Sequence, residues 1–76
     1  MNAQRRKDLL ALAAQIGDLC EAVEGLRDEE QEYLDNMPEG IKDGYRGDAS
    51  QNAIDCLDSA VDGLYTAVAE IESAAE

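Results

Sequence analysis

Two long stretches of the chain repeat apolar residues at alternating steps of three and four. In the first stretch, the repeat runs through Leu9, Leu12, Ile16, Leu19, Val23 and Leu26, and then through Glu30, Tyr33 and Met37. In the second, it runs through Ser50, Ile54, Leu57, Val61, Leu64, Val68, Ile71 and Ala75. This spacing follows one face of an α-helix, and no strand can use it. We therefore predict two amphipathic helices, at about residues 3–35 and 48–75, with these apolar positions as their packing seam.

The segment 36–47 between the two repeats contains the only proline, Pro38, and three of the six glycines. Proline and glycine interrupt helices, so both helices should stop at this loop. Asp48, followed by Gln51, predicts an N-cap for the second helix. The loop is long for a helical hairpin, so Ile41 and Tyr45 either fold back over the open end of the helix pair or bind a partner.

A pair of helices shields only one seam from water, and a chain of 76 residues rarely reaches stability on one aliphatic seam. Alanine recurs at every seventh position beside the second seam, where small side chains let another helix approach closely. These residues are Ala53, Ala60, Ala67 and Ala74. We predict an all-α fold: an antiparallel, coiled-coil-like hairpin that dimerises into a four-helix bundle.

Eighteen acidic and six basic residues give a net charge of −12. Such a charge argues against direct binding to nucleic acid or to an anionic membrane surface. No apolar run approaches the roughly 20 residues that cross a bilayer, and the basic start does not continue as a signal peptide, so we expect a cytoplasmic protein. In an antiparallel hairpin, Arg5, Arg6 and Lys7 should face the acidic residues Glu70, Glu72 and Glu76, where the two helix ends meet.

The remaining acidic residues either form a solvated face or imitate nucleic acid. A rod about 42 Å long, from helices of about 28 residues, would span about 25 phosphate charges of duplex DNA, and a dimer would carry twice −12. A basic DNA-binding groove could accept such a rod. The candidate partner-binding residues are Glu21, Glu24, Asp28, Asp55, Asp58 and Asp62, with Tyr45 from the loop.

Residues for catalysis are scarce, because the chain has no histidine, and neither Cys20 nor Cys56 has a basic neighbour that would activate it. We expect no enzyme activity, cofactor or metal. A remote alternative is a metal-dependent nucleotide pyrophosphohydrolase, because Ile-Gly-Asp-Leu at 16–19 is similar to segments of the MazG-like family. The pairs Glu21/Glu24 and Asp55/Asp58 have the carboxylate spacing of that family, but all four residues fall off the seam.

Three segments carry a second resemblance: Glu-Glu-Gln-Glu-Tyr at 29–33, Asn-Met-Pro-Glu at 36–39 and Arg-Gly at 46–47. They resemble a group of small acidic helical proteins from phages and mobile elements of Gram-positive bacteria, and the resemblance spans most of the chain. No activity is assigned to that group, so no functional residue carries over.

The resemblance implies a bacterial host cell and two kinds of task, which are inhibition of a host or defence protein and assembly. We expect a non-enzymatic inhibitor that occupies the basic nucleic-acid-binding groove of a host or defence protein, like the DNA mimics and anti-CRISPR inhibitors. The alternative is a structural or assembly protein that acts through its apolar flank.

Overall fold

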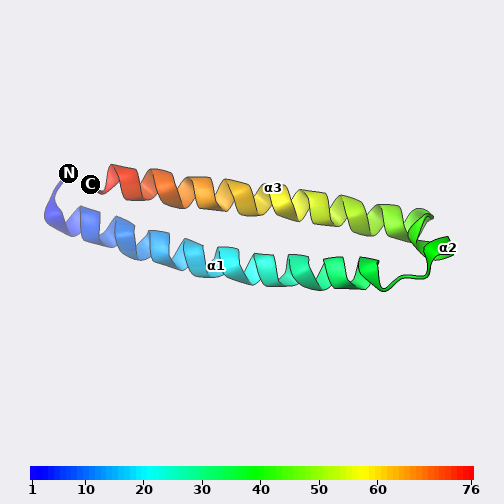
Figure 1. The fold of residues 1–76 in the computed structure, drawn as a ribbon. Helices are drawn as coiled ribbons and strands as arrows, with labels where there is room; N and C mark the ends of the chain where they lie inside the picture. Colours follow the sequence, from blue (N-terminus) through cyan, green and yellow to red (C-terminus); the bar gives the residue numbers. More distant parts are fainter.

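The computed structural model describes residues 1–76 and contains three helices and no strand. The two long helices, α1 (Ala3–Asp35) and α3 (Tyr45–Ala74), lie side by side and antiparallel, and both chain termini lie at one end of the molecule (Figure 1). The short helix α2 (Glu39–Lys42) lies at the other end. The predicted all-helical hairpin is confirmed. No helix combines the length and the apolar character that crossing a membrane requires.

The hairpin is a rod with extents of 59 × 14 × 11 Å. It is longer than the predicted rod of about 42 Å because α1, with its 33 residues, is itself about 50 Å long at about 1.5 Å per residue, and the loop with α2 extends beyond its end (Figure 1). The side chain of Asn2 caps α1 by accepting a hydrogen bond of 2.7 Å from the backbone N–H of Arg5. Asn36 ends α1, and its N–H donates to the carbonyl oxygen of Glu32 at 3.0 Å.

The predicted start of the second helix is wrong by three residues. α3 begins at Tyr45 with Gly44 as N-cap, and Asp48 lies in its first turn without capping it. The earlier start depends on Gly47, which is buried where the chain turns out of α2. Ile41 and Tyr45 do not cover the open end, because they are 42% and 88% exposed.

The contact between the helices uses a different register on α1 from the predicted one. One set of contact positions on α1 was not predicted and comprises Ala13, Cys20, Arg27 and Leu34, of which all but Arg27 are buried. These positions alternate with four that belong to both the predicted and the observed register: Leu9, Ile16, Val23 and Glu30. The predicted seam residues Leu12, Leu19 and Leu26 lie outside this contact and are largely exposed. Because α1 carries apolar residues both three and four positions after Leu9 and Ile16, the spacing alone fits either register.

On α3 the covered positions coincide with the repeat in the sequence. Ser50, Ile54 and Ala75 are buried, and Leu57, Val61, Leu64, Val68 and Ile71 are half-buried. Only seven residues of the chain are buried. The single hairpin therefore has a narrow core, in line with the expected limit of one seam between two helices.

The basic residues at the start of α1 do not pair with the acidic residues at the end of α3. The only ion pairs in the chain belong to Arg27, although the two termini lie at the same end of the rod (Figure 1). Arg6 instead donates a hydrogen bond of 2.7 Å to the carbonyl oxygen of Met1. Exposed ion pairs between long side chains contribute little free energy, so the fold does not need them.

Candidate interaction surfaces

Four apolar residues of α1 form an exposed row that we call the apolar ridge: Leu12, Leu19, Leu26 and Tyr33. Their exposed fractions are 50%, 64%, 63% and 54%. Steps of seven residues keep them on one side of the helix, next to the seam. Scattered exposed leucines are common, but a contiguous row along one helix marks a surface suited to another helix.

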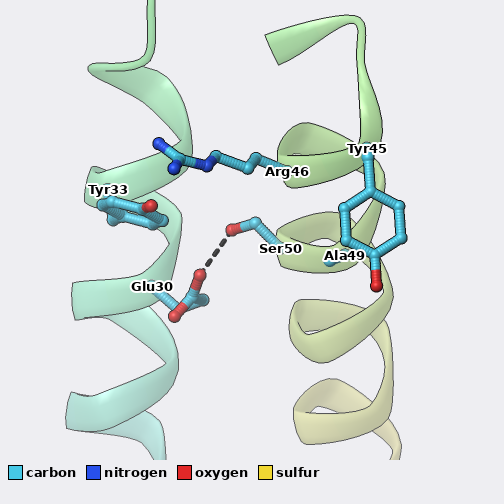
Figure 2. A pocket seen from close by; sticks show the side chains of 6 residues that line it. All are labelled: Glu30, Tyr33, Tyr45, Arg46, Ala49 and Ser50. Atoms are coloured by element: carbon cyan, nitrogen blue, oxygen red, sulfur yellow. Dashed lines mark hydrogen bonds between the residues drawn. The ribbon is translucent and has the colours of Figure 1, made fainter. Parts of the chain in front are cut away.

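α3 carries a matching row on the same side of the hairpin, the alanine stripe of Ala53, Ala60, Ala67 and Ala74. Arg46 lies one heptad step before Ala53, and its side chain extends from α3 toward Tyr33 of the apolar ridge (Figure 2). The two rows therefore share one face of the rod, which we call the apolar face. No acidic residue belongs to either row.

A shallow depression of about 270 Å³ lies where the apolar face meets the loop end of the hairpin. Its lining comprises Glu30, Tyr33, Tyr45, Arg46, Ala49 and Ser50 (Figure 2). The guanidinium of Arg46 forms no ion pair, and the ring of Tyr45 lies along the outer side of α3. The depression is open and holds no buried unpaired polar atom, so it lacks the enclosed polar groups of a small-molecule site.

A polar layer interrupts the seam near this end. The hydroxyl of Ser50, which is buried, donates a hydrogen bond of 2.5 Å to Oε2 of Glu30 (Figure 2). The sequence suggests either a basic partner for Glu30, among Arg27, Lys42 and Arg46, or a place where the helices separate. In the structure the partner of Glu30 is Ser50, and Glu30 forms no ion pair. A polar layer in a largely apolar seam favours one register of the helices over its neighbours.

The opposite side of the hairpin carries the acidic flank, which comprises Glu21, Glu24, Asp28, Asp55, Asp58 and Asp62. Positions 24 and 58 lie about 200° around their helices from ridge residue 26 and stripe residue 60, and steps of three and four place the other four beside them. The structure thus places all six predicted acidic residues on one side. Tyr45, the further candidate for partner binding, lies at the loop-end depression and not on this side.

Arg27 is the only cation that pairs within the acidic flank. Its Nε lies 2.8 Å from Oδ1 of Asp58 across the hairpin, and its Nη1 lies 3.4 Å from Oδ1 of Asp28. The hydrogen bond to Asp58 raises the pKa of the Arg27 guanidinium. The remaining flank carboxylates have no basic partner, so the flank keeps most of its negative charge.

Tyr65 joins the acidic flank through a hydrogen bond that the sequence does not predict. Its hydroxyl donates to Oε1 of Glu24, and this bond is the main reason that the pKa of Tyr65 rises to about 12. The thiol of Cys20 lies 3.9 Å from the same oxygen and 3.8 Å from the carbonyl oxygen of Val61. Burial raises the pKa of Cys20, which makes its thiol unreactive.

The carboxylates do not converge on a metal position. No group of three histidine, cysteine, aspartate or glutamate side chains is arranged to hold a metal ion. Glu21 and Glu24 lie on α1, Asp55 and Asp58 on α3, and both pairs stand on the acidic flank rather than inside the seam. They therefore lack the inward-facing arrangement that helical di-metal sites use.

The observed length of the rod lowers the charge density of a dimer relative to that of duplex DNA. Over 59 Å, duplex DNA carries about 35 phosphate charges, whereas two copies of this chain carry twice −12. The close match predicted from the shorter rod is therefore wrong. A dimer would have about two-thirds of the charge density of DNA.

The apolar ridge is the feature that sequence reasoning misplaces. Its signal is present in the sequence as the seven-residue repeat of Leu12, Leu19, Leu26 and Tyr33, which the spacing alone assigns to the seam inside the hairpin. Comparison of the chain with known protein families, with curated protein sequences and with solved structures finds no match.

Proposed function

We propose that this protein is a non-enzymatic protein–protein interaction module that associates with a second copy through its apolar face to form a four-helix bundle. The observation that supports this function is the apolar ridge, whose four members, from Leu12 to Tyr33 of α1, are each at least half exposed. A ridge of this kind has no role in a solitary hairpin, because it stays in contact with water.

The energetics support the same conclusion. Complete burial of a leucine side chain contributes about 1.5–3 kcal/mol, so covering the exposed half of each ridge leucine contributes about 1 kcal/mol. Three such leucines in each copy contribute about 6 kcal/mol to a dimer, which offsets the loss of translational and rotational freedom on association. The single hairpin buries only seven residues. Association would bury the apolar ridge as well and so enlarge the hydrophobic core.

The test compares two variants that each add one negative charge at an exposed helical position. Leu19→Asp places the charge on the apolar ridge, and Asn52→Asp places it on the outer side of α3. We expect the melting temperature of the wild type and of Asn52→Asp to rise with protein concentration, and that of Leu19→Asp to be lower and independent of concentration. Equal behaviour of the two variants would contradict the proposal.

The acidic flank supports a second candidate function, which is inhibition of a basic host or defence protein by occupation of its nucleic-acid-binding groove. The supporting observation is that these carboxylates share one side of the rod and only Arg27 neutralises any of them. In the proposed bundle both flanks face outward, so the two functions are compatible. Groove binding of this kind weakens steeply with ionic strength, whereas apolar docking does not.

Two triple variants with equal changes of charge test this candidate. One neutralises the flank through Glu21→Gln, Asp55→Asn and Asp62→Asn, and the other neutralises the end of α3 through Glu70→Gln, Glu72→Gln and Glu76→Gln. The wild type and both variants are immobilised and exposed to lysate from a Gram-positive bacterium. Bound proteins are then eluted with a short DNA duplex. We expect nucleic-acid-binding proteins to elute from the wild type and the second variant only. Identical elution from both variants would contradict groove occupation.

The proposed setting, a phage or mobile element in the cytoplasm of a bacterial host, follows from the sequence resemblance. The pyrophosphohydrolase alternative has no supporting observation among the side-chain positions, because its carboxylates stay apart on the surface.

A further inference from the structure

The alanine stripe and the apolar ridge step by the same seven residues along antiparallel helices. Contacts across the hairpin, such as Cys20 to Val61 and Arg27 to Asp58, fix the register of α1 against α3. By the contact of Arg27 with Asp58, Leu26 lies about level with Ala60, and by the contact of Cys20 with Val61, Leu19 lies at a level between Ala60 and Ala67. Each large side chain on the apolar face thus has a small one within one helical turn of its own level.

We infer that two copies pair face to face about a two-fold axis parallel to the rod, so that the apolar ridge of each copy lies on the alanine stripe of the other. This inference rests on the proposed self-association and adds its geometry. A rotation about that axis exchanges the two sides of the face without changing the level along the rod. Leu19 of one copy then lies against the stripe of the other between Ala60 and Ala67, and the two loops lie at the same end of the bundle.

The length of the apolar face suits a second copy. It extends for about 32 Å along the rod, from Leu12 to Tyr33 at about 1.5 Å per residue, so a second hairpin can pack alongside it over several helical turns. The face is also self-complementary, since one surface supplies both the ridge and the row of small residues that receives it. An interface related by a two-fold axis needs this property.

The other two-fold arrangement, with the axis across the rod, is less favourable. It would place ridge on ridge and alanine stripe on alanine stripe, with the loops at opposite ends. Leucines facing leucines hold the first helix pair apart, while the alanines of the second pair need a close approach to touch. One rigid hairpin cannot satisfy both spacings along its length.

Disulfide trapping distinguishes the two arrangements. Cys56→Ser removes the exposed native thiol, and Cys20 is buried in the seam. In this background Leu19→Cys and Ala67→Cys are made as separate chains of different mass, oxidised alone, and then oxidised as a mixture. A second pair, Leu26→Cys and Ala60→Cys, covers the case in which one cysteine variant disturbs folding.

We expect covalent dimers chiefly in the mixtures, where each dimer contains one chain of each variant. Each variant oxidised alone should give at least tenfold less cross-linked dimer. Efficient cross-linking of Leu19→Cys with itself would overturn the geometry while leaving self-association intact. No cross-linking in any sample, together with a monomeric mass, would overturn both the geometry and the proposed function.

Discussion

Gly47 and Lys42 touch through their backbones: a β-carbon at position 47 would lie only 1.6 Å from the carbonyl oxygen of Lys42. Glycine is therefore required there by the close approach of α2 to the first turn of α3, and the backbone conformation of Gly47 itself is ordinary. This contact explains why α3 starts at Tyr45, before the position expected from the capping pattern.

Gly47→Ala should destabilise the protein, because the new methyl group must push the end of α2 away from α3. Overpacking of this kind costs about 1–3 kcal/mol. Gly63→Ala is the matched control, since nothing lies within 4 Å of its β-carbon, and alanine should add about 1 kcal/mol of helix stability there. Urea unfolding followed by circular dichroism measures both. Opposite signs are expected, and two stabilising substitutions would contradict the described loop.

Ser50→Ala should remove the partner of Glu30 inside the seam. A polar group left without its hydrogen bond costs about 1–3 kcal/mol, and the same substitution at the exposed Ser59 should change the free energy of unfolding by much less. Denaturant titration of the two variants tests the difference. If Ser50→Ala and Ser59→Ala have equal stability, the bond between Ser50 and Glu30 does not contribute.

Tyr65 should titrate at higher pH than a free tyrosine. Its pKa is about 12 in the folded protein and about 10 in an unfolded chain, so its hydrogen bond to Glu24 stabilises the fold fully below pH 10. That contribution is lost as the pH rises through 12. Ultraviolet titration of tyrosinate should show a late component that Tyr65→Phe removes and that Tyr45→Phe leaves in place. A titration without this component would contradict the contact.

The two thiols should differ in reactivity. Cys20 is completely buried and its pKa is raised by that burial, whereas Cys56 is exposed. A thiol reagent should therefore label Cys56 quickly and Cys20 only as fast as the hairpin opens. Cys56→Ser should abolish the fast phase, and denaturant should merge the two phases for the wild type. Equal rates under native conditions would place Cys20 outside the core.

The helices are predictable from sequence because their signals are local and repeated. The two apolar repeats, with their steps of three and four residues, and the turn residues around Pro38 are enough to predict two helices and a turn. The register of α1 is not predictable in the same way, because Ala13 and Leu12 both fit the spacing after Leu9. Only the packing against α3 selects the smaller residue.

The surfaces are predictable in part. The acidic flank follows from the spacing of Glu21, Glu24 and Asp28, because steps of three and four residues place them on one side of any α-helix. The contacts of Tyr65 with Glu24 and of Gly47 with Lys42 join residues distant in sequence or in different elements. Such contacts depend on the register of the helices and on the path of the loop, which no local pattern encodes.

Sedimentation equilibrium of the wild-type chain, over a range of micromolar concentrations, tests self-association through the apolar face most directly. The proposed bundle predicts a mass of twice 8.2 kDa, and Leu19→Asp should shift the species toward the single chain. A wild-type protein that stays at 8.2 kDa at every concentration, with its ridge leucines in water, would contradict the account.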